Sequence, residues 1–175
     1  MESKRSTFRA ALNYGVMAAL GSFIYSILLY ITKEFLNQGL SWINYVILVT
    51  AIVFAVMNRK NKDFGGFISF GEAFKLGFFV SLISGLIGVV TTYLMMTVIA
   101  PDMIGAILQK SQTDMINKGL SDDQVKAAMD MTSKFVTPTM MSVLVLIFVT
   151  AIGTILSLIV AAIFKKENTQ LQAPQ

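Results

Sequence analysis

The sequence predicts an all-α, polytopic membrane protein with four transmembrane helices and an extracytoplasmic amphipathic helical hairpin between helices three and four. The first observation is composition: 55% of the 175 residues are hydrophobic and 14% are charged, whereas soluble domains are about 25% charged. The second is a mean hydropathy of +0.68, too high for a soluble domain of this size, which buries only about 70% of its surface. The third is that four long runs contain no charged residue.

The four charge-free runs predict four membrane-spanning helices in a single domain over residues 1–175. A span needs about 20 mainly apolar residues, because the hydrocarbon core is about 30 Å thick. A barrel strand would show about 10 residues of alternating polarity, and these runs do not alternate. We therefore expect helical spans over about residues 10–32, 40–58, 73–99 and 138–164.

The first span follows a basic tail and so resembles the start of a signal peptide. Its apolar stretch is too long for one, and no small-residue cleavage site follows Tyr30 before the polar pair Lys33 and Glu34. The sequence therefore predicts that this segment is an uncleaved transmembrane helix.

The distribution of Lys and Arg predicts that both termini face the cytoplasm, since positively charged loops stay on that side. Nine of the fourteen lie in the N-terminal tail, between spans two and three, at the start of span three, or in the C-terminal tail. The other five follow span one or lie between spans three and four. These charges can contact anionic lipid headgroups. No clustered basic face with interleaved aromatic residues is present, so we expect membrane lipids and no nucleic acid as partners.

Two capping-box patterns, Ser69 with Glu72 and Ser121 with Gln124, predict helix starts. Glu72 and Lys75 are also the ionisable residues nearest to the core of a span, where such groups often mark ion pathways. One interpretation is a gating pair or a headgroup anchor. The alternative is that Glu72 completes the capping box and favours the positive helix N-terminus, while Lys75 extends to the headgroups.

The segment between spans three and four, residues 102–136, predicts two amphipathic helices joined at Lys118-Gly119-Leu120. In the second of these helices, Val125 and Met129 share a stripe that we expect to pack inward. The opposite stripe contains charged residues that are partly i,i+4 neighbours. We expect these residues to face outward, available to a partner: Asp123, Lys126, Asp130 and Lys134.

Small residues recur every four positions in the spans, a pattern that lets membrane helices approach closely. The stripes either pack within one four-helix bundle or, for a stripe such as that of span three, contact a second copy or a partner helix. A narrow polar path is disfavoured because no charge accompanies it. The candidate interface residues are therefore Ser69, Glu72, Lys75, Gly77, Ser81, Gly85, Lys126, Asp130 and Lys134.

The amino-acid composition argues against catalysis and metal binding. The chain contains neither His nor Cys, which excludes imidazole and thiolate sites, and no nucleophile–base pair can be assembled. Eight of the eleven Met lie between Met95 and Met141, and thioethers bind Cu(I). Met also fills loose helix contacts, and Met129 and Met131 fall on different helix faces. We expect no catalytic residue, no cofactor and no metal site.

Several segments resemble one family. They are the stretch ISFGEAFKLG at residues 68–77, the outer segment GLSDDQV at 119–125 with AMDM at 128–131, and the ending IFKK at 163–166. Together they resemble the bacterial membrane family called domain of unknown function 4199, over nearly the whole chain. The resemblance implies four spans in the inner membrane of a Gram-negative bacterium. It implies no activity and no catalytic residues.

The expected function is therefore that of a non-enzymatic integral membrane protein. It would act as a scaffold or accessory protein through helix–helix and outer-hairpin contacts, with a second copy or a membrane protein as partner. The alternative is a subunit of a small oligomeric transporter or channel, since four helices alone enclose only a tight pore. A membrane enzyme is disfavoured because no acid–base or metal set is present.

Overall fold

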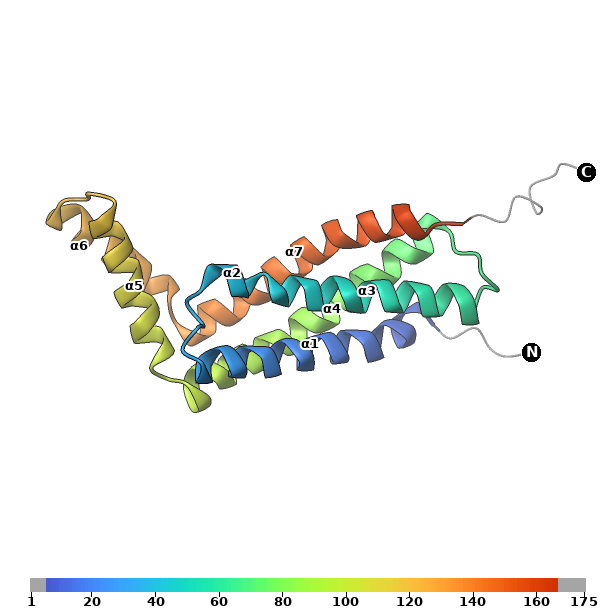
Figure 1. Cartoon of the computed structure of the whole chain (residues 1–175), viewed down its shortest axis with the longest axis horizontal. Coiled ribbons are helices and arrows are strands. Elements are labelled where there is room, and N and C mark those ends of the chain that lie inside the picture. The colour runs from blue at the N-terminus through green and yellow to red at the C-terminus, as the bar shows by residue number, and fades with distance from the viewer. Residues whose placement is uncertain (1–5, 167–175) are drawn as a thin grey trace, which may run out of the picture.

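The computed structural model describes residues 6–166, and this part of the chain is helical (Figure 1). Its α-helices are α1, Thr7–Ile31; α2, Gln38–Ser41; α3, Ile43–Lys62; α4, Phe70–Leu94; α5, Met103–Asn117; α6, Asp122–Phe135; and α7, Pro138–Phe164. A π-helical turn, η1, Met95–Ile99, extends α4. The predicted all-α fold class is confirmed.

Four helices are long and apolar enough to cross a membrane, as predicted. They cover Thr7–Ile31, Gln38–Lys62, Phe70–Ile99 and Pro138–Phe164. Figure 1 shows the four lying side by side, with the start of α1 and the end of α7 at one end of the bundle and α5 and α6 at the other. Large apolar side chains such as Ile24, Phe54, Val90 and Ile155 are exposed on the bundle, as expected for helices that face lipid.

Helix α4 is the central helix of the bundle, because it packs most extensively on α7, next on α1, and also on α3. The fully buried side chains of Ile52, Val56, Leu76 and Val80 form the middle of this core. The chain enters α4 through a turn in which Gly65 and Gly66 have φ of +58° and +91°, a region that favours glycine. Ser69 caps the helix as predicted: its Oγ accepts a hydrogen bond from the Glu72 N–H at 3.3 Å.

Helix α3 ends later than predicted. The second span was expected to stop near residue 58, yet the helix continues to Lys62. Basic residues at a helix C-terminus are favourable because they complement the negative end of the helix dipole. The first charged residue, Arg59, therefore indicates where the apolar part of the helix ends, and the helix continues for about one more turn to Lys62. This extra turn places Arg59 inside the protein.

Helices α5 and α6 form the predicted hairpin. They pack chiefly on each other and project from the end of the bundle (Figure 1). Gly119 supplies the left-handed turn between them, with φ of +81°. The capping box at the start of α6 is confirmed, since the Gln124 side chain accepts from the Ser121 N–H at 3.0 Å. The π-helical bond from the Ala100 N–H to the Met95 carbonyl, at 2.7 Å, ends the third span before α5.

Candidate functional site

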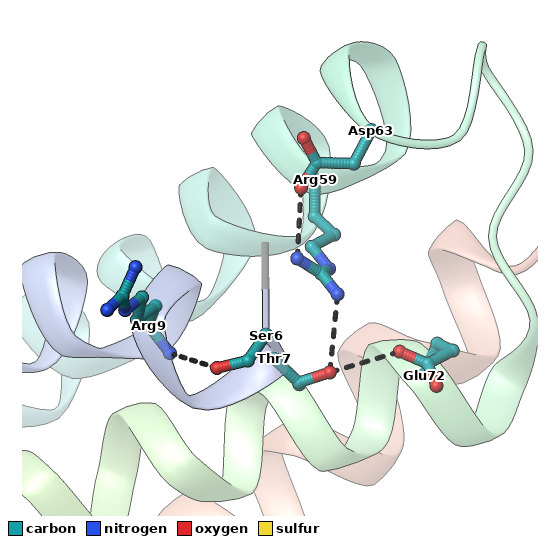
Figure 2. A network of polar contacts seen from close by, with 6 residues as sticks. All are labelled: Ser6, Thr7, Arg9, Arg59, Asp63 and Glu72. Atoms are coloured by element: carbon teal, nitrogen blue, oxygen red, sulfur yellow. Dashed lines mark hydrogen bonds and ion pairs between the residues drawn. The ribbon is translucent and has the colours of Figure 1, made fainter. Parts of the chain in front are cut away.

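A polar network lies at the end of the bundle where α1 begins and α7 ends (Figure 2). Its centre is Arg59, which is only 6% exposed. The Nη1 of Arg59 donates to Oδ2 of Asp63 at 2.9 Å, and its Nη2 donates to Oγ1 of Thr7 at 3.3 Å. Thr7 Oγ1 in turn donates to Oε2 of Glu72 at 3.3 Å. The network therefore connects α1, α3 and α4.

Local sequence explains why these groups meet. Arg59 and Asp63 lie one helical turn apart, and Asp63 is the C-cap of α3. Ser6 caps α1 by accepting from the Arg9 N–H at 3.2 Å, which makes Thr7 the first residue of that helix. Glu72 lies in the first turn of α4, where the helix dipole favours a negative charge.

One prediction about this end is wrong. Glu72 was expected to complete a capping box with Ser69, but its carboxylate accepts from the Thr7 hydroxyl instead. The start of α1 packs against the start of α4 and brings this hydroxyl within reach. Lys75 is exposed and makes no ion pair with Glu72, although the structure describes both residues. The two side chains are therefore not joined by an ion pair, and their role in gating or headgroup binding stays a prediction.

The fourth long helix joins the same end through backbone contacts. Lys60 Nζ donates to the Phe164 carbonyl at 3.0 Å. A cation is thus bound to a carbonyl at the C-terminus of α7, where such contacts are favourable. Ile68 and Lys166 exchange two backbone hydrogen bonds, of 3.0 and 2.9 Å, as an isolated antiparallel bridge. All four long helices are thus linked here.

Sequence reasoning missed Arg59, Thr7 and Asp63. Arg59 was counted only as a topology signal in a loop, together with its basic neighbours. The available signal was the i,i+4 spacing of Arg59 and Asp63, because oppositely charged residues four apart share a helix face. Nothing in the sequence connects that pair to Thr7, which lies far away along the chain.

The predicted small residues of span three lie between α4 and α7. A Cβ at Gly77 would lie 2.8 Å from Ser157 Cβ, and one at Gly153 would overlap the side chain of Ser81. The two glycine–serine contacts are therefore reciprocal. Ser81 and Ser157 direct their hydroxyls back to their own helices, donating to the carbonyls of Gly77 and Gly153 at 3.0 and 2.6 Å. Gly85 likewise faces α7, where a Cβ would lie 3.0 Å from Leu146 Cδ1. This stripe is covered within one chain, as the bundle-packing alternative predicts.

The remaining predicted residues lie on the hairpin, far from the polar network. Lys126, Asp130 and Lys134 are exposed along α6 and Val125 is buried, as predicted, while Met129 is half-buried. Although they are i,i+4 neighbours, Lys126, Asp130 and Lys134 form no ion pair with one another among the described residues. Apolar side chains are also exposed beside the charges, Met131 at 64% and Phe135 at 53%. The predicted residues thus occupy three separate places and form no single site.

A cavity of about 440 Å³ lies in the hairpin half of the bundle, where α1, α3, α4 and α7 line it. Most of its lining is apolar, with a minority of hydroxyl and amide groups and no Asp, Glu, Lys or Arg. Over residues 6–166, no three His, Cys, Asp or Glu side chains are grouped as metal ligands. Sequence reasoning did not predict this cavity, because its walls come from segments distant in the chain.

Comparison with known proteins gives one result. No curated protein and no solved structure matches the chain. A family model described as "Protein of unknown function (DUF4199)" matches residues 7–166. This match runs from the first residue of α1 to the residue that bridges Ile68, and so includes the bundle, the polar network and the hairpin. The chain therefore belongs to the DUF4199 family, as the motifs around Ser69–Lys75 and at its C-terminal end predict.

Proposed function

We propose that the protein is a non-enzymatic scaffold or accessory protein of the bacterial inner membrane. Its α5–α6 hairpin would lie on the extracytoplasmic side and bind another membrane protein. The supporting observation is that the hairpin projects from the bundle and packs chiefly on itself. It leaves a long surface of α6 exposed beyond the four helices.

The chemistry of the α6 surface favours a protein partner. Lys126, Asp130 and Lys134 follow one another at i,i+4 spacing and alternate in sign. An adjacent ridge carries Met131 and Phe135, which are more than half exposed. Apolar anchors bordered by charge are typical of protein interfaces. A helix that binds anionic lipid instead concentrates Lys and Arg on its polar face.

Site-specific crosslinking from the hairpin tests this proposal. A photoreactive amino acid at Ala127, which is exposed on α6, should give a discrete crosslink to a second membrane protein in native membranes. Lys126→Glu should weaken that crosslink severalfold without changing membrane abundance. Lys118→Glu is the matched control, because Lys118 is also exposed but lies at the hairpin turn. Equal crosslinking in both variants, or no crosslink from Ala127, would contradict the proposal.

A subunit of a small oligomeric transporter or channel is the second candidate, and the cavity is the observation that favours it. In one chain the cavity occupies only the hairpin half. Fully buried side chains, among them Ile52, Val56 and Leu76, fill the core nearer the chain ends. Transport would therefore require an oligomer or a rearrangement of α4. Solute flux into liposomes containing the purified protein, compared with protein-free liposomes, tests this candidate.

A further inference from the structure

We propose that the 440 Å³ cavity is a binding site for an uncharged amphipathic molecule, an aliphatic chain that carries a hydrogen-bond donor such as a hydroxyl or amide group. This ligand site lies in the bundle and is separate from the charged surface of α6. The inference therefore goes beyond the proposed scaffold role and does not depend on it.

The dimensions of the cavity fit a small ligand. Ligand sites typically measure about 300–1,000 Å³ and are mostly apolar with a few polar groups. Here every long helix contributes to the wall: Ser22 comes from α1, Asn44 from α3, Ser84 from α4 and Phe148 from α7. The site is thus a feature of the assembled bundle.

The absence of charge in the lining selects an uncharged ligand. No Asp, Glu, Lys or Arg borders the cavity. An ion bound among membrane helices without an opposite charge carries a large desolvation penalty. The same wall offers apolar contact from Leu48, Leu144 and Val145. A ligand that combines an aliphatic body with a neutral polar group satisfies both parts of this lining.

Four polar groups of the wall have an oxygen that can only accept a hydrogen bond. Asn44 Oδ1 is buried and has no hydrogen-bond partner within residues 6–166. Three hydroxyls use their single hydrogen on their own helices: Ser26 donates to Ser22 O at 2.9 Å, Ser41 to Asn37 O at 3.2 Å, and Thr91 to Gly88 O at 3.2 Å. Each then retains only acceptor lone pairs. A ligand that donates a hydrogen bond would satisfy Asn44, whereas a pure hydrocarbon would leave it unsatisfied.

The methionines explain how the site accommodates a flexible chain. Met95, Met96, Met103 and Met141 all line the cavity. Their unbranched, polarisable side chains adapt to the shape of an apolar ligand. Four of the eight Met between Met95 and Met141 thus form part of the wall, and no thiolate, imidazole or carboxylate lines it with them.

Photolabelling of the full-length protein in liposomes tests the site. The probes are a diazirine-bearing octanol and the corresponding diazirine-bearing octane, which lacks the hydroxyl group. The octanol probe should label peptides of the cavity wall saturably, and unlabelled 1-octanol should compete. The wild type should prefer the octanol over the octane probe by about three- to tenfold, the effect of one net hydrogen bond.

Two variants test separately the hydrogen bond to the ligand and the volume of the cavity. Asn44→Leu keeps a side chain of similar size and should abolish the preference for the hydroxyl group. Asn58→Leu is the matched control, because Asn58 lies in the same helix outside the cavity, and it should keep the preference. Ser22→Phe should narrow the cavity and reduce saturable labelling by both probes. Thermal unfolding and membrane abundance confirm that each variant is folded.

A further experiment distinguishes a ligand that comes from the lipid bilayer from one that comes from solution. A photoreactive monoacylglycerol incorporated in the vesicle tests a lipid, and the octanol added from solution tests a soluble molecule. Saturable cavity labelling in either arm supports the site. The inference is overturned if labelling does not saturate, if it spreads over the lipid-facing helix surfaces, or if Asn44→Leu behaves like Asn58→Leu. It is independent of the crosslinking result at Ala127, so the two proposals fail separately.

Discussion

The substitution Gly153→Ala tests the close contact between α4 and α7. A Cβ on Gly153 would overlap both Oγ and Cβ of Ser81, which is fully buried. A Cβ cannot rotate away, because its position is fixed by the backbone. The two helices must therefore separate locally, and the reciprocal contact of Gly77 with Ser157 would loosen with them.

The expected decrease in the free energy of unfolding of Gly153→Ala is the balance of two opposing effects. Overpacking a well-packed core costs about 1–3 kcal/mol. The backbone fixes both the Cβ of Ser81 and the new Cβ at position 153, so we expect a cost near the upper value, about 3 kcal/mol. Replacing Gly by Ala within a helix contributes about 1 kcal/mol in the other direction. The net free energy of unfolding should therefore fall by about 2 kcal/mol. For a chain of this size the Tm should fall by about 4–8 °C.

Thermal unfolding in detergent, followed by far-UV circular dichroism, measures this loss. Gly71→Ala is the matched control in α4, because a Cβ there meets nothing within 4 Å, and its Tm should not fall. Ser81→Gly combined with Gly153→Ala returns space to the contact and should recover at least 1 kcal/mol in a double-mutant cycle. The close contact is refuted if Gly153→Ala unfolds at the same temperature as Gly71→Ala, or if the cycle shows no coupling.

Three further predictions concern topology, the polar network and the hairpin. Because the chain has no Cys, single cysteines can be placed at Asn61 and Asn117; an impermeant thiol reagent on intact spheroplasts should label position 117 alone, and the reverse pattern would invert the proposed orientation. Arg59→Gln should lower the free energy of unfolding by about 2–3 kcal/mol, because it leaves a partly buried carboxylate without its cation; exposed Lys62→Gln should not, and equal thermal stability of the two would contradict this. Ser121→Ala should destabilise α6 by about 1 kcal/mol through loss of its cap, seen as faster amide hydrogen exchange in the hairpin with no change in the bundle.

The spans could be predicted because they depend on local composition. In lipid, a run of about 20 apolar residues has few alternatives to a helix, so length and hydropathy suffice. The capping box of Ser121 and Gln124 was predictable for a similar reason, since its two partners are three residues apart. The turn at Gly119 follows from the conformational freedom of glycine.

Features that depend on distant segments could not be predicted. Glu72 had a plausible local partner in Ser69, but the fold supplied Thr7, which is 65 residues away. Small-residue stripes occur in every span, so the sequence could not indicate that α4 and α7 would pair. The burial of Arg59 depends on three helices meeting, and the cavity depends on four.

The contact between α4 and α7 also determines when the fold can be completed during synthesis. Proteins are made from the N-terminus, so α4 enters the membrane while its main partner is still on the ribosome. Until α7 arrives, the ridge of Gly77, Ser81 and Gly85 lacks its main partner helix, and only Ile52 of α3 lies beside Gly77. Lys166, which bridges Ile68, follows only after α7. A nascent chain that stalls before Pro138 would leave this ridge exposed to lipid and to other helices. Insertion of α7 is therefore the step that completes the four-helix bundle.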